Sequence, residues 1–215
     1  MPFGFHRRGS ADPAKAAPVE ATPELAAGGR QNAARTGVPF DGLTEDWRLV
    51  GSIDLEGRLL DILNRREAIP IGDMAWAPLD ALGDLQPAPG LQKVDPYDLI
   101  VVLAGDRTLP ALDDAEKAAL RVHKVPYDVV LEVPPYRVAG TVFLYPGSEP
   151  ERLMDRSSDL FFPVTNAIVL GADARLGDGE VDVVLVNRSY LRGVKQVDEF
   201  VLASARESQR VPPAS

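Results

Sequence analysis

The chain of 215 residues has no cysteine and only two histidines, His6 and His123. Without cysteine it has no disulfide bond, no thiolate nucleophile and no cysteine-ligated metal. The two histidines form neither a paired-histidine metal motif nor a Ser-His-Asp arrangement. His123 lies at the basic end of a predicted helix, where a cation is favourable for electrostatic reasons alone. We therefore expect no metal and no cofactor.

Long apolar runs are also missing, since none approaches the ~20 residues that span a bilayer. The first ten residues, MPFGFHRRGS, lack the apolar stretch of a signal peptide. The sequence has no P-loop, and the glycines on either side of Asp178 lack the context of a dinucleotide-binding fingerprint. We expect a cytoplasmic protein without a membrane span.

Positive charge is scarce, because 23 Lys and Arg stand against 32 Asp and Glu, for a formal net charge of -9. Residues 1–37 hold five basic and three acidic residues, so the rest of the chain carries a net charge of -11. An acidic body repels phosphate groups. Nucleic-acid binding by the folded part is therefore not expected.

Residues 1–37 are rich in Ala, Pro, Gly and charge and poor in large apolar side chains. Such a stretch buries too little surface to offset its conformational entropy, so we predict a disordered tail. Its tip carries Phe3, Phe5 and the pair Arg7-Arg8. This tip is either an ordinary chain start or a docking peptide that tethers the body to a larger, acidic partner.

The sequence does contain an internal repeat, because residues 47–76 and 136–169 share short blocks in the same order. Self-similarity at a nearly fixed spacing is the signature of duplication. The offsets between matched blocks run from 84 to 94 residues. We therefore predict a tandem duplication. The matched blocks are residues 38–41 with 125–128, 47–51 with 136–140, 58–61 with 152–155, 70–73 with 163–166, and 98–102 with 182–186.

Hydrophobic patterning predicts similar elements in the two copies. In the first copy, residues 38–104, we predict a helix at 58–66, an exposed loop at 78–96, and strands at 47–55, 69–77 and 99–103. In the second copy, residues 125–197, we predict a helix at 151–157 and strands at 127–133, 136–144, 161–170, 181–187 and 191–197. Outside the copies we predict a connector helix at 105–124 and a C-terminal helix and tail at 198–215.

Each copy thus reads as strand, short helix, strand, strand. Connections this short favour antiparallel neighbours. The predicted fold class is α+β and mostly β, with two pseudo-symmetric strand-helix-strand-strand repeats. Strands of this length form either a small barrel or two packed antiparallel sheets.

The second copy resembles an uncharacterised bacterial domain family through four blocks. The resemblance implies a fold and no activity, and fold alone does not define function. After the helix aspartate the family usually has a leucine-asparagine pair, which the first copy keeps as Leu63-Asn64 and the second replaces by Arg156-Ser157-Ser158. The blocks are Tyr136-Arg137 with Gly140, Arg152-Leu153-Met154-Asp155, Thr165-Asn166-Ala167-Ile168-Val169, and Val186-Asn187-Arg188.

The repeated helix motif supplies the candidate ligand-binding residues, Arg58 with Asp61 and Arg152 with Asp155. Residues three apart on a helix are neighbours, so each pair favours a structural ion pair. The alternative is an exposed arginine clamp for an anionic ligand, with the aspartate orienting the guanidinium.

Large aromatic side chains are expected mostly in the core. These are Trp47, Trp76, Tyr127, Tyr136 and Phe162. An exposed Trp76 or Tyr145 would instead mark a contact surface.

We expect a non-enzymatic binding or assembly module with a protein partner, for which the N-terminal tail offers one route of docking. The alternative is a hydrolase or lyase that uses carboxylates such as Asp61, Asp155 and Asp128. A nucleic-acid-binding small barrel is a third hypothesis, which the negative charge disfavours. The sequence leaves the partner, the ligand and the oligomeric state open.

Overall fold

The computed structural model describes residues 37–105, 124–155, 159–171 and 181–198. This part of the chain is mostly β, as predicted. The predicted tail, the hairpin turn at Asp178-Gly179, and all but the outermost residues of the connector and C-terminal helices lie outside the described residues. No helix in the described ranges has the length and apolar character needed to cross a membrane.

The first half of the described chain carries seven strands and the second half carries five. The strands are β1 Val38–Leu43, β2 Trp47–Ile53, β3 Ile69–Pro70, β4 Gly72–Pro78, β5 Gln86–Pro87, β6 Lys93–Val94, β7 Val101–Ala104, β8 Val125–Val133, β9 Tyr136–Leu144, β10 Phe161–Leu170, β11 Val181–Asn187 and β12 Gly193–Gln196. The helices are α1 Leu59–Asn64 and the 3-10 turns η1 Pro96–Asp98, η3 Pro150–Met154 and η4 Arg188–Tyr190.

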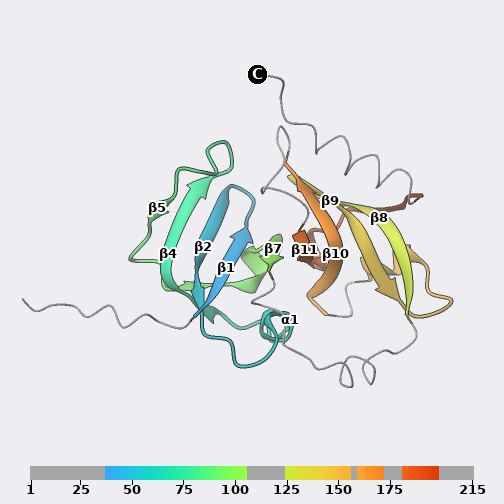
Figure 1. Cartoon of the computed structure of the whole chain (residues 1–215), viewed down its shortest axis with the longest axis horizontal. Helices are drawn as coiled ribbons and strands as arrows, with labels where there is room; N and C mark the ends of the chain where they lie inside the picture. Colours follow the sequence, from blue (N-terminus) through green and yellow to red (C-terminus); the bar gives the residue numbers. More distant parts are fainter. Residues whose placement is uncertain (1–36, 106–123, 156–158, 172–180, 199–215) are drawn as a thin grey trace, which may run out of the picture. The chain divides into compact units, whose positions relative to one another are not determined.

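Ten of these strands form one antiparallel sheet in the described part of the chain, in the order β12-β8-β9-β10-β11-β7-β1-β2-β4-β5. Figure 1 shows β7 and β11 between the strands of the two halves. The sheet is not closed, so the prediction of a small barrel is wrong. The two halves instead join edge to edge, because β7 pairs with β11 from Val101↔Val186 to Ala104↔Val183. Only β3 and β6 pair apart from it, as a two-stranded ribbon.

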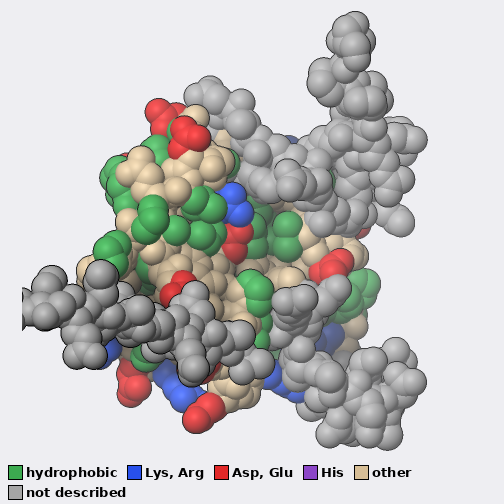
Figure 2. All heavy atoms as spheres, turned by 60° about the vertical axis from the view of Figure 1, so that its left-hand side comes forward, with side chains coloured by type: hydrophobic (Ala, Val, Ile, Leu, Met, Phe, Trp, Pro, Cys, Tyr) green, Lys and Arg blue, Asp and Glu red, His purple; other side chains and the backbone are tan. Residues whose placement is uncertain are grey.

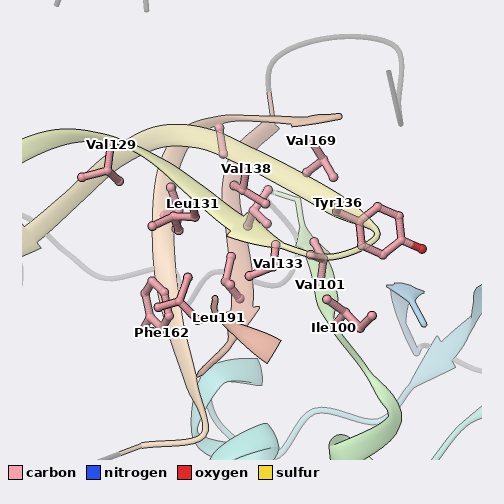
Figure 3. Packing of buried hydrophobic residues seen from close by; sticks show 14 of the residues in the cluster. Ile100, Val101, Val129, Leu131, Val133, Tyr136, Val138, Phe162, Val169 and Leu191 are labelled. Atoms are coloured by element: carbon pink, nitrogen blue, oxygen red, sulfur yellow. The ribbon is translucent and has the colours of Figure 1, made fainter. Parts of the chain in front are cut away.

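Two hydrophobic clusters lie on opposite faces of the central strands. Neighbouring residues of a strand point to opposite faces. Accordingly Val101 belongs to one cluster with Tyr136, and Val102 belongs to the other with Phe40. In β11, Val184 and Leu185 divide in the same way. The prediction that the apolar run at 99–103 is covered on both faces is therefore confirmed. Figure 3 shows part of the cluster that contains Tyr136.

Both halves contain a β-bulge opposite a glycine. Between Val50 and Ser52 the partner strand β4 has one extra residue, and between Ala139 and Thr141 the partner strand β10 has one extra residue. The glycine in each gap is Gly51 or Gly140. A bulge bends its strand and brings the backbones closer together, which explains the absence of a side chain at these two positions.

The short helices follow the local sequence. Leu59 and Leu63, four residues apart, are buried on one face of α1. The helix ends before Arg66, which has a positive φ of 62°. The predicted helix at 151–157 is shorter than expected, because η3 is a 3-10 turn that starts at Pro150 and ends at Met154.

Candidate functional site

The predicted pair of Arg58 and Asp61 lies at the start of α1. Arg58 is the N-cap residue with an extended backbone, and it is half-buried, whereas Asp61 is exposed in the first turn. No ion pair joins the two side chains within the described residues. The helical i, i+3 geometry that favours an ion pair requires both residues inside the helix. Because Arg58 precedes it, the predicted ion pair does not form.

The second predicted pair, Arg152 and Asp155, lies at the end of η3. Both residues are exposed, and the Asp155 N–H donates to the Arg152 carbonyl at 3.0 Å. The two pairs are held by different elements, since α1 packs against β10 and η3 packs against β12. An anion clamp at either pair stays a prediction.

Arg188 is a buried cation that sequence reasoning did not single out as a site residue. Its side chain is 8% exposed and donates to the carbonyls of Asp159, at 3.0 Å, and Leu153. The guanidinium also lies 4.9 Å from the centre of the Phe162 ring. Burial lowers its pKa, and the carboxylates of Asp159 and Asp155 partly offset this. Arg188 therefore fastens η3 and the start of β10 to η4. The only sequence signal for it was the Val-Asn-Arg block.

Two asparagine side chains tie the halves together. Asn187 is fully buried, and its amide donates to the carbonyls of Leu99 at 2.7 Å and Pro96 at 3.3 Å. Its side-chain oxygen accepts from the N–H of Ser189 at 2.9 Å. Asn64 of α1 accepts from the Phe161 N–H at 2.7 Å and donates to the Phe161 carbonyl at 3.2 Å. These bonds give the interface between the halves a defined geometry.

Tyr136 supplies a further link. Its ring is buried in the second half, and its hydroxyl donates to the Thr44 carbonyl in the turn between β1 and β2. In Figure 3 its hydroxyl oxygen points out of the cluster. Burial, assisted by the carboxylate of Asp46, raises the pKa of this phenol well above its ordinary value of 10.0. The neutral phenol is therefore the form that the fold selects.

We expect this phenol to make the fold sensitive to alkaline pH. As pH rises above 10.0, the unfolded chain releases the Tyr136 proton while the folded chain retains it. The free energy of unfolding then falls, by at most about 1.4 kcal/mol per pH unit for this one group. Tyr136→Phe should remove that part of the loss, at a cost of about 1 kcal/mol at neutral pH. Urea denaturation across the alkaline range measures both effects. An alkaline loss equal to that of the native chain would contradict this assignment; Tyr145→Phe is the exposed control.

Trp47 and Trp76 form an exposed aromatic pair. Their ring centres lie 4.5 Å apart with an interplanar angle of 89°, an edge-to-face arrangement. Trp47 is 42% exposed and Trp76 is half-buried. The expectation of a core position is therefore wrong for Trp47, whereas it is confirmed for Tyr136 and Phe162. Trp47 begins β2 opposite the last residue of β4, and the end of this strand pair leaves the ring in solvent.

The exposed leucine Leu85 lies just before β5, which pairs with β4 at Trp76. We call Trp47, Trp76 and Leu85 the tryptophan surface. Its turn is fixed, because the Trp47 N–H donates to the Thr44 hydroxyl at 3.0 Å. The Leu79 N–H donates to the Asp46 carbonyl at 3.3 Å and ties the loop after β4 to this turn. Figure 2 shows hydrophobic side chains gathered on this side of the first half, with acidic side chains at their upper margin.

A second exposed apolar group lies at the far end of the hairpin β8–β9. Phe143 is 48% exposed and Tyr145 is 58% exposed, which meets the condition set from the sequence for a contact surface. Val125, at the start of β8, is also exposed, and the Lys124 ammonium lies 5.4 Å from the centre of the Tyr145 ring. The sequence therefore identified one exposed aromatic residue correctly and assigned Trp47 to the core.

The described residues contain no group of three or more His, Asp or Glu side chains arranged to hold a metal ion. Comparison of the chain with protein families, curated proteins and solved structures found no match. The site must therefore be argued from the geometry of this chain.

Proposed function

We propose that the chain is a non-enzymatic binding module built from two copies of one unit, and that it holds a protein partner at the tryptophan surface. The observation that carries the proposal is the exposed pair Trp47–Trp76 on a turn held by hydrogen bonds. Tryptophan is among the residues that contribute most to binding energy at protein interfaces. Its exposure costs hydrophobic stabilisation, which a bound partner restores.

Strand order supports the duplication. The first half has the order β7-β1-β2-β4, and the second half has the order β12-β8-β9-β10. In each half a 3-10 turn directly precedes the strand placed first, η1 before β7 and η4 before β12. Both turns begin with a short polar cap: Asp95 accepts from the Tyr97 N–H, and Asn187 accepts from the Ser189 N–H. Chance convergence on all three features is a weaker account than common ancestry.

The bulges support it further. Asp73 and Asn166, which the sequence alignment matched, are both in the left-handed region, with φ of 50° and 48°. This region is rare for residues other than glycine. A Cβ at Gly51 would lie 2.8 Å from the Gly72 carbonyl oxygen, and a Cβ at Gly140 would lie 2.9 Å from the Thr165 carbonyl oxygen. The two copies would thus share a glycine, a bulge and a left-handed residue.

The same geometry revises two of the matched blocks. Gly51 pairs with Phe40, and Gly140 pairs with Val129. The match of residues 38–41 with 125–128 is therefore two residues out of register. The block at 98–102 lies in η1 and β7, whereas its assigned match lies in β11, a strand in another position of the sheet. On the proposed correspondence Asp95 matches Asn187.

Binding at the tryptophan surface is tested with two matched variants. The full chain and its Trp47→Ala and Phe143→Ala forms are used to capture partners, which are identified, purified and rebound. We expect Trp47→Ala to weaken the purified interaction about 30-fold, roughly 2 kcal/mol, because it removes the central exposed indole. Phe143→Ala removes an equally exposed aromatic ring elsewhere and should leave affinity unchanged. Equal losses in both variants, or none in either, would overturn the proposal.

The other expectations from the sequence stay predictions beside this one. They are a cytoplasmic location, docking through the N-terminal tail, and the alternative hydrolase or lyase. Of the carboxylates named for that alternative, Asp128 accepts a hydrogen bond from the Thr141 hydroxyl at 2.7 Å. Asp61 and Asp155 are exposed on separate elements. No arrangement among the described residues favours catalysis over binding.

A further inference from the structure

We infer that the segment bound at the tryptophan surface is cationic, an extended peptide stretch that carries arginine or lysine. This inference rests on the proposed function and names the chemistry of the partner. It follows from the charges around the aromatic pair and from the open indole of Trp47.

Acidic side chains flank the surface on two sides. Glu45 and Asp46 directly precede Trp47 in the turn between β1 and β2, and both are exposed. Asp80 and Asp84, also exposed, lie in the loop that leads from β4 to Leu85. The hydrogen bond from Leu79 to Asp46 holds that loop against the turn. Four carboxylates thus lie on the two segments that frame the indole pair.

The nearest basic residue in the chain does not neutralise them. Arg48 donates to both carboxylate oxygens of Asp41, at 3.0 and 2.7 Å, and to the Leu82 carbonyl at 3.5 Å. A guanidinium held by a carboxylate in this forked geometry contributes little net charge to its surroundings. The turn and the loop therefore present a negative field to an approaching ligand.

An exposed indole ring complements such a field. Its face is negative and attracts an ammonium or guanidinium within about 6 Å of the ring centre. The chain already uses this contact twice, with Lys124 against Tyr145 and Arg188 against Phe162. A cationic side chain on Trp47, with carboxylates on both flanks, would satisfy ring and charges together. An anionic segment would be repelled, and a neutral one would gain nothing from the carboxylates.

The chain provides its own probe for the test, because Trp47 and Trp76 are its only two tryptophans. Tryptophan emission of the full chain is recorded during titration with three peptides of glycine and serine. The first carries arginine, the second citrulline in its place, and the third glutamate. We expect only the arginine peptide to change the emission, with affinity that falls as salt rises.

Charge-neutral variants locate the effect. The combination Glu45→Gln, Asp46→Asn, Asp80→Asn and Asp84→Asn should weaken the arginine peptide about tenfold at low salt. The matched control removes the same number of exposed carboxylates beyond the opposite end of β2, and it should bind as the native chain does. Its substitutions are Asp54→Asn, Glu56→Gln, Asp61→Asn and Glu67→Gln.

Each outcome separates the two proposals. Equal binding of the citrulline peptide, or equal losses in the two charge variants, would overturn the cationic inference and leave binding at the surface intact. Failure of all three peptides to change the emission would also overturn the cationic inference. A captured partner that binds Trp47→Ala with native affinity would overturn the proposed function itself.

Discussion

Replacing Asn187 by alanine is expected to lower the free energy of unfolding by about 3 kcal/mol, because three buried backbone groups lose their partner at once. These groups are the carbonyls of Pro96 and Leu99 and the N–H of Ser189. A buried polar group without a hydrogen bond costs far more than the net value of the bond that satisfied it. Thermal unfolding should shift down by roughly 10 °C for a unit of this size.

The exposed amide of Gln196 in β12 is the control for this substitution. Gln196→Ala should change stability by less than about 0.5 kcal/mol, since surface substitutions of this kind are nearly neutral. Calorimetry or urea denaturation of the two variants measures the difference. A loss at Asn187 no larger than that at Gln196 would show that its amide does not join the halves.

Alanine at Gly51 or Gly140 is expected to destabilise the fold by about 2–3 kcal/mol in each case, as overpacking of a rigid contact does. At Gly51 the new methyl group would lie 2.5 Å from the Ile71 Cγ2 atom, and at Gly140 it would lie 2.7 Å from the Val164 Cγ1 atom. In both cases a carbonyl oxygen of the bulged strand lies within 3.0 Å. Backbone atoms of a ladder do not move aside as a flexible side chain does.

This pair of substitutions also tests the proposed duplication. Two copies of one unit should lose similar stability at equivalent positions, and urea denaturation of the single variants measures this. Gly83→Ala is the control, because nothing lies within 4 Å of a Cβ at that position. A large loss at one glycine beside none at the other would argue against equivalent bulges.

The strands of the second half were predictable because their side chains alternate or form continuous apolar runs. The predicted bounds of β9, β10 and β11 agree with the structure, and β8 begins two residues before its predicted start. The order of these strands across the sheet was not predictable in this way. It depends on pairings such as that of β7 with β11, between residues far apart in the chain.

The first strand, β1, was missed for a local reason. Its sequence contains Pro39, Asp41 and Gly42, all residues that are depleted in strands. The fold uses them, since Phe40 and Leu99 pack so close to Gly42 that a Cβ there would lie 2.8 and 2.9 Å from their side chains. Packing between distant segments overrode local preference. The two-residue strands β5 and β6 escaped notice within the predicted loop for the same reason.

The candidate site shows the same limit. A tryptophan in an alternating strand is usually core, and only the register of β2 against β4 places Trp47 at the open end of the sheet. Arg188 shows the converse, because arginine is rarely buried without partners and the partners here are carbonyl groups. Composition and periodicity carry no signal for contacts of this kind.

The outermost strand of the first half bears on polymerisation. β5 ends the sheet with only Gln86 and Pro87, and Pro87 has no N–H to offer a further strand. Pro89 follows two residues later. Short, proline-bearing margins of this kind deter the strand-by-strand stacking that leads to fibrils. The molecule therefore presents an aromatic docking face beside a margin that another chain cannot readily extend.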